Sequence, residues 1–177
     1  KARTITLIWL LRCIDIHSAI NTMTFSTIGR EKIIALKTPE EIENSINKMP
    51  NPKAASKRRD LINNGLSSRH LVGDFFTLHR MFDDMQTALK KSTWLTGNNY
   101  RMADTAIIAY VDRLDRLGMS GLWAKRFPAI SNWLEASKAR ASYKTALDPF
   151  VSQNETENTR RVGEKKWPEV KQRWDDF

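Results

Sequence analysis

The sequence contains one cysteine, Cys13, so it cannot form an intrachain disulfide. A single unpaired thiol is typical of a reducing compartment, and we expect a cytoplasmic protein. No run reaches the roughly 18 apolar residues that a membrane-spanning helix needs, so no membrane segment is predicted. The apolar stretch at residues 5–11 is short, ends at Arg12 and is followed by no small-residue cleavage pattern, which argues against a secretion signal.

The sequence also lacks any long segment in which apolar and polar residues alternate, so no β-sheet is predicted. Its 177 residues, 41% of them hydrophobic, suffice for one domain with its own core. Apolar residues recur instead every three or four positions, between Pro and Gly residues that mark turns. We therefore predict an all-α helical bundle. Because helical periodicity already runs at Ile5 while the chain starts at Lys1, we expect that a preceding segment has been removed.

The expected first helix has apolar residues over most of its circumference and should be covered on several sides. A bend is expected near Gly29, after which the helix continues. Thr38 and Glu41 form a capping-box start, and Gly65 is placed to cap a helix C-terminus. The expected helices cover residues 2–20, 21–37, 53–64, 68–91 and 103–111, with further helices starting at Thr38, Pro128 and Ser142.

Basic residues outnumber acidic ones, since 29 Lys and Arg against 20 Asp and Glu give a net charge of +9. Such a charge favours acidic proteins, nucleic acid or an anionic membrane surface without choosing among them. The basic residues are scattered in small clusters, such as residues 57–59 and 165–166. We therefore expect solvated helix faces rather than a nucleic-acid track.

The most informative segment is residues 94–111, which joins a turn, a helix start and an apolar helix. Gly97 and the two Asn residues after it supply a turn that tolerates positive φ. Asp104 lies near the third helical position, where its carboxylate can accept the Arg101 backbone N–H and favour the positive helix end. Arg101 stands where a capping box has Ser or Thr, so the reciprocal bond is missing. The apolar run that follows predicts a helix buried on nearly all sides.

Together with a closing pattern, this segment resembles the C-terminal helical domain of glutathione transferases. The pattern consists of Phe127-Pro128, Trp133-Leu134, Ala139-Arg140 and Ser142-Tyr143. The resemblance reaches from residue 1 to about residue 147 and implies an all-α domain of that type at residues 1–150. Residues 151–177 are polar apart from Trp167 and Trp174, and we expect a C-terminal tail that is partly docked or disordered.

The resemblance implies a role in a glutathione transferase, a detoxification enzyme that moves an alkyl or aryl group onto glutathione. The chain would form the wall of a pocket for a hydrophobic electrophile and part of a homodimer interface. A thioredoxin-like N-terminal domain would bind glutathione, the co-substrate, and activate its thiol. This sequence has no βαβ pattern, so we assign it no catalytic and no glutathione-binding residue. The alternative is a non-catalytic module of the same fold that binds a protein or a nucleic acid.

A narrower resemblance rests on the insertion at residues 38–52, the basic helix after it and the polar tail. These features are similar to bacterial glutathione-dependent β-etherases, which cleave aryl ethers of the lignin type. This second resemblance implies an aryl ether as the electrophile.

Four residues are candidates for contacts with the electrophile. His17, near the end of the first helix, can donate and accept a hydrogen bond, although a structural histidine is the alternative. Cys13, one turn earlier, lines the same pocket or belongs to the core. Tyr110 and Arg113 share a face of the later helix and could orient a polar substrate, unless Arg113 pairs with a neighbouring Asp.

The sequence contains no pattern typical of a catalytic triad, a phosphate loop or a zinc site. His70 and His79 are nine residues apart and face opposite sides of one helix, so no metal site is predicted. Asp104 is assigned to structural capping rather than to chemistry.

Overall fold

The computed structural model describes residues 2–147 and 149–177. Lys1, on which the expectation of a removed segment rests, lies outside the described residues. The described residues form helices joined by turns and loops and contain no strand, which confirms the all-α prediction. Its elements are α1 (Ala2–Thr24), the π-helical turn η1 (Phe25–Gly29), α2 (Arg30–Leu36), α3 (Pro39–Asn47), α4 (Pro52–Asn64), the 3-10 turn η2 (Gly65–Ser67), α5 (His70–Leu89), α6 (Met102–Arg116), α7 (Gly121–Ala124), α8 (Ala129–Lys138), α9 (Ala141–Leu147), α10 (Gln153–Glu164) and α11 (Trp167–Trp174).

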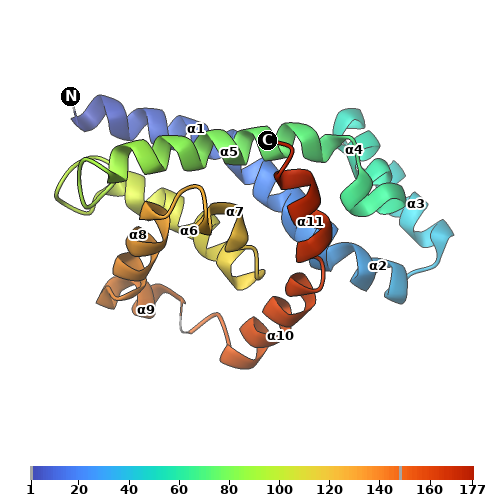
Figure 1. Ribbon diagram of the computed structural model, residues 1–177. Coiled ribbons are helices and arrows are strands. Elements are labelled where there is room, and N and C mark those ends of the chain that lie inside the picture. The colour runs from blue at the N-terminus through green and yellow to red at the C-terminus, as the bar shows by residue number, and fades with distance from the viewer. Residues whose placement is uncertain (1, 148) are drawn as a thin grey trace.

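The centre of the molecule is a bundle of α1, α5, α6 and α8 (Figure 1). The long helices α1 and α5 lie side by side, α6 packs on α1, and α8 packs on both α5 and α6. Apolar residues three or four positions apart place one stripe of each helix in the shared core. The largest completely buried side chains include Phe75, Phe82, Ile107, Trp123 and Trp133.

The first helix does not end at residue 20 but runs to Thr24 and then into η1, a π-helical turn that ends at Gly29, near which a bend was expected. In η1 the backbone widens into a π-helical turn while residues 25–28 stay buried. The Thr27 hydroxyl donates to the Met23 carbonyl oxygen at 2.7 Å. Single π-turns within long helices often mark functional positions, because they re-aim the side chains that follow.

Residues 30–64, which we call the arm, project from the end of the α1–α5 pair at which α1 ends and α5 begins (Figure 1). The predicted capping box is present, since the Glu41 N–H donates to Thr38 Oγ1 at 3.2 Å and the Thr38 N–H donates to Glu41 Oε2 at 2.8 Å. Asn51 caps α4 through its side-chain oxygen. Gly65 follows α4 with a φ of 52°, a left-handed conformation that favours glycine. The local start and stop signals of the arm are therefore confirmed.

Two burial predictions were wrong. Helix α6 buries Ala103 and Ile107 but leaves Thr105 and Ala109 exposed, because α1, α8 and α10 cover only part of its circumference. Helix α1 is likewise not covered on several sides, since Leu11 and Ile14 are 69% and 73% exposed. The outer face of α1 is therefore an uncovered apolar strip.

The C-terminal segment forms two helices that lie against the bundle (Figure 1). Trp174 is 2% exposed, and its ring lies 5.8 Å from that of Phe75. Gly163 is buried so close to α6 that an added Cβ would lie 1.8 Å from the Leu117 carbonyl oxygen. Within the described residues, no helix combines the length and the apolar character needed to cross a membrane. The division of the chain at residue 150 stays a prediction.

Candidate functional site

Asp104 organises the start of α6. Its Oδ2 accepts the Arg101 backbone N–H at 3.0 Å, and the Arg101 side chain, having no acceptor, returns no bond. Its Oδ1 accepts the Leu95 backbone N–H and the Trp133 indole N–H, each at 2.9 Å. The carboxylate has no exposed surface. Asp104 thus joins the turn at residues 94–97, α6 and α8, and each of these three hydrogen bonds serves the fold.

Cys13, His17 and Tyr110 lie together where α1 meets α6. The Tyr110 hydroxyl donates to the Cys13 carbonyl oxygen at 3.4 Å, and the rings of His17 and Tyr110 are 6.1 Å apart in an edge-on arrangement. The Cys13 thiol donates to the Trp9 carbonyl oxygen at 3.3 Å. Burial raises the pKa of the Cys13 thiol and that of the Tyr110 hydroxyl. Both groups therefore stay protonated at neutral pH, and His17 is exposed beside them.

Arg113 lies on the same face of α6, three residues after Tyr110. Its Nε donates to the Thr24 hydroxyl of α1 at 3.4 Å. Burial lowers the pKa of the Arg113 guanidinium, and the charge of Arg116 acts in the same direction, while Asp112 and Glu155 oppose them. The ion pairs of the described residues do not include Arg113. Arg113 therefore does not form the ion pair with a neighbouring Asp that the sequence left open.

Those neighbouring carboxylates serve other partners. Asp112 binds the Tyr143 hydroxyl at 2.6 Å and lies 2.8 Å from Arg116 Nε. Asp115 accepts from Lys138 at 2.7 Å and from Arg160 at 3.0 Å. Burial and then the hydrogen bond to Asp112 raise the pKa of Tyr143 far above its ordinary value. This network holds α8, α9 and α10 to α6. It was not anticipated, because its members are up to 45 residues apart.

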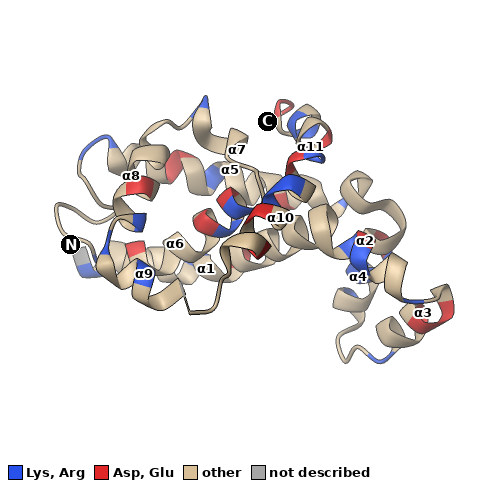
Figure 2. Ribbon diagram, turned by 90° about the horizontal axis from the view of Figure 1, so that it is seen from below, with Lys and Arg blue, Asp and Glu red and all other residues tan. Residues whose placement is uncertain are grey.

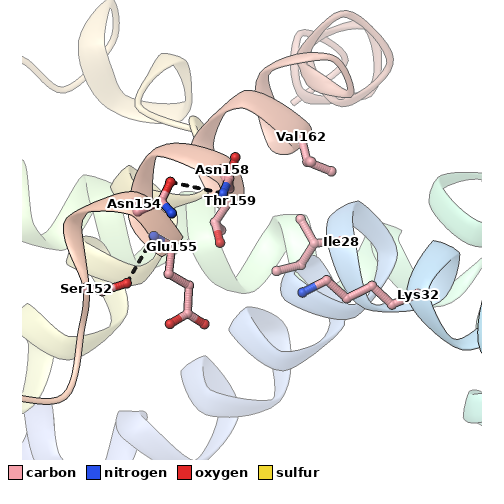
Figure 3. A pocket seen from close by; sticks show the side chains of 8 residues that line it. All are labelled: Ile28, Lys32, Ser152, Asn154, Glu155, Asn158, Thr159 and Val162. Carbon is pink, nitrogen blue, oxygen red and sulfur yellow. Dashed lines mark hydrogen bonds between the residues drawn. The ribbon is translucent and has the colours of Figure 1, made fainter.

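A pocket of about 310 Å³ opens between η1 and α10 (Figure 3). Ile28 and Lys32 line one side, and Glu155, Asn158 and Val162 line the other. Its lining includes none of the four predicted contact residues. The charge of Glu155, which lines this pocket, acts to raise the pKa of the Arg113 guanidinium.

The α1 residues of this region lie on one side of their helix. Cys13, His17 and Thr24 are separated by four and seven residues, which returns each to nearly the same face, and Ile28 follows in the π-helical turn η1. They run from the Tyr110 contact, past Arg113, to the pocket. We call the surface formed by Cys13, His17, Tyr110 and Arg113 the α1–α6 strip. Helical spacing predicts that Cys13 lies near His17 and that Tyr110 lies near Arg113. The pocket between η1 and α10 could not be predicted in this way, because no residue pattern in α10 indicates a ligand.

The charged residues do not form a single track. Figure 2 shows Lys and Arg segments interspersed with Asp and Glu segments, for example along α10 and α11. Among the residues that the structure describes, no group of three or more His, Cys, Asp or Glu side chains could hold a metal ion.

A family model described as "Glutathione S-transferase, C-terminal domain" matches residues 77–136. The matched segment runs from within α5 to within α8 and includes Asp104 with its partners Leu95 and Trp133. The match supports a place for this chain in that family, without supporting the narrower likeness to β-etherases. No curated protein and no solved structure matches the chain.

Proposed function

We propose that this chain is the helical domain of a glutathione-transferase-like enzyme, in which the α1–α6 strip and the neighbouring pocket receive a hydrophobic electrophile. One observation carries the proposal: Cys13 and His17 of α1 contact Tyr110 of α6, and Arg113 lies on the same face of α6 as Tyr110 and bonds to Thr24 of α1. The family match to residues 77–136 supports the same assignment. Glutathione as the co-substrate and a thioredoxin-like domain as its binding partner belong to this proposal.

In the reaction, the glutathione thiolate attacks an electrophilic carbon and forms a carbon–sulfur bond, and the leaving group departs with the electron pair of the broken bond. The thioredoxin-like domain activates the glutathione thiol in this proposal, and Cys13 does not act as the nucleophile, because burial raises the pKa of its thiol. His17 can donate a hydrogen bond to the leaving atom. The partly buried guanidinium of Arg113 attracts negative charge that develops there. An aryl ether, whose leaving group is a phenolate, is the finer form of this proposal.

We further propose that the uncovered strip of α1 is covered in the functional enzyme by a second copy of the chain. Ile8, Leu11 and Phe76 surround a groove of about 350 Å³ between α1 and α5. These three side chains are 47%, 69% and 61% exposed. Exposed apolar side chains that are bordered by charged residues, here Arg12, Asp15 and Arg80, are typical of an interface. Cytoplasmic location remains part of the proposal on the grounds given by the sequence.

The test combines the chain with the thioredoxin-like domain that the proposal requires. His17→Ala should lower kcat/KM for the electrophile about tenfold, which corresponds to about 1.4 kcal/mol, while KM for glutathione stays constant. His79→Ala is the matched control, because His79 packs on Phe127 and Trp174 and should affect the melting temperature without selective kinetics.

The isolated chain should neither bind glutathione at micromolar concentration nor turn over a chloronitrobenzene. A glutathione-dependent rate from the isolated chain would refute the need for a second domain. If His17→Ala impairs the kinetics equally for the electrophile and for glutathione, His17 has a structural role. If all variants bind nucleic acid with a steep dependence on salt, the non-catalytic binding module is the better description.

A further inference from the structure

The second pocket lies on a different side of α1 from the α1–α6 strip, between α1 and the arm. Ser18, Asn21 and Phe25 line it from α1 and η1, and Arg58 and Leu61 line it from α4. Its volume is about 210 Å³. Pockets for drug-sized ligands have about 300–1,000 Å³, so this one suits a smaller molecule.

Arg58 is the distinctive group of this pocket. Its guanidinium carbon lies 4.1 Å from the centre of the Phe25 ring, in a cation–π contact. In the part of the chain that the structure describes, the ion pairs and hydrogen bonds do not involve Arg58. Burial lowers the pKa of its guanidinium, and no neighbouring carboxylate opposes that shift. Removing a cation from water without a counter-ion costs free energy, which a bound anion would offset.

The neighbouring basic residues are used differently. Arg59 donates to both carboxylate oxygens of Glu43 and to Asn47. Lys57 also lines the pocket, but it pairs with Asp74 of α5 at 3.0 Å. Of these three consecutive cations, Arg58 alone lacks a carboxylate partner. The pocket lining contains no Asp or Glu, so nothing in it repels an anion.

The rest of the lining provides both polar and apolar contacts. The side chains of Ser18 and Asn21 have no hydrogen-bond partner among the described residues and can donate to an oxyanion. Met49 and Leu61 add an apolar wall beside the Phe25 ring. A planar guanidinium matches the two oxygens of a carboxylate in geometry, and its pairing with such an anion is charge-assisted.

We propose that the pocket between α1 and α4 binds a small organic carboxylate, whose carboxylate group pairs with Arg58 and whose apolar body lies against Met49 and Leu61. The ligand inserts between α1 and the arm and joins them. This site is independent of the electrophile pocket, so its test does not require a second domain.

Benzoate is the probe, titrated into the full chain and followed by calorimetry and by amide chemical shifts. We expect one saturable site, with shifts concentrated in residues 18–25 and 54–61. Arg58→Gln should weaken binding by about tenfold or more, as the loss of a charge-assisted pair predicts. Arg59→Gln, the matched control with the same charge change, should bind within about twofold of the wild type, because Arg59 serves Glu43.

Two neighbouring probes separate the contributions. Benzamide has the same ring without the charge and should not bind measurably, and acetate has the charge without the ring and should bind more weakly than benzoate. If Arg58→Gln does not fold, Arg58→Lys keeps the charge and loses the forked geometry, and it too should bind more weakly. Equal affinity in wild type and Arg58→Gln, equal binding of benzamide, shifts confined to other residues, or no saturation would each overturn the proposal.

Discussion

The bundle and the arm are stabilised by different interactions. In the bundle, α5 alone buries Leu71, Phe75, Leu78 and Phe82 almost completely. In the arm, all of which the structure describes, residues 46 and 61 are the only buried apolar positions. Complete burial of such a side chain stabilises by about 1.5–3 kcal/mol, whereas an exposed ion pair contributes little. We therefore expect the arm to open locally while the bundle stays folded.

The bundle and the arm also differ in their relation to the family match. The matched segment, residues 77–136, lies wholly within the bundle and its connections. The arm lies outside it and forms one wall of the Arg58 pocket. The family match therefore includes Tyr110 and Arg113, whereas Cys13, His17 and the arm lie outside it.

The largest effect is expected from Asp104→Ala, which should destabilise the bundle. The change removes the acceptor of three donors, two of which are buried. Since a buried donor left without a partner costs about 1–3 kcal/mol, we expect a loss of roughly 3–5 kcal/mol in the free energy of unfolding. Urea unfolding measures it. Asp104→Asn keeps one oxygen and should lose less, and a variant as stable as the wild type would show that these bonds contribute nothing.

Gly163→Ala tests whether the C-terminal helices belong to the bundle. The added methyl meets the Leu117 backbone, which cannot move aside easily, and we expect a loss of about 1–3 kcal/mol. Gly73→Ala is the control, because no atom lies within 4 Å of the added Cβ and the helix gains about 0.5–1 kcal/mol. Unfolding midpoints that move in the same direction would contradict the docking of α10.

Arg101→Ser should strengthen the start of α6. A serine oxygen at this position can accept a backbone N–H of the first turn, and such caps contribute about 1 kcal/mol. The Arg101 side chain makes no capping bond that would be lost. The melting temperature should rise, and a lower one would mean that Arg101 has a more important contact than the missing cap.

The smallest effect is expected in the arm, from Glu43→Gln. Arg59 holds the pKa of Glu43 below its ordinary value, so the pair stabilises the arm at neutral pH and loses this contribution as the pH falls through that lowered pKa. Amide hydrogen exchange in α3 should therefore accelerate in the variant, while the melting temperature of the bundle stays constant. Glu40→Gln, in the same helix, is the charge-matched control. A parallel loss of bundle stability would show that arm and bundle unfold as one unit.

Much of the fold could be predicted from neighbouring residues. The capping box at Thr38, the cap at Gly65 and the turn at Gly97, with its φ of 132°, depend on backbone geometry within a few positions. Helical spacing likewise placed Cys13 with His17, and Tyr110 with Arg113. That these two pairs face one another could not be predicted, because it depends on how α1 packs on α6.

The two wrong burial predictions have a related cause. An apolar helix surface indicates that another surface can pack against it. The sequence does not show whether that surface belongs to the same chain or to another molecule. Leu11 and Ile14 are apolar in sequence and exposed in the structure. Conversely, α10 is a largely polar segment, yet it closes one side of a pocket because Gly163 allows a close approach to α6.

By itself, the sequence determined the helical class, the starts of α3, α4, α8 and α9 and the Asp104 cap on the Arg101 backbone, since each follows from interactions within one or two turns. Only the tertiary structure decided that Asp104 also accepts from Leu95 and Trp133, and that Arg58 lies on Phe25 without a carboxylate. These contacts join residues between 9 and 33 positions apart, and chain packing rather than local preference sets their distance.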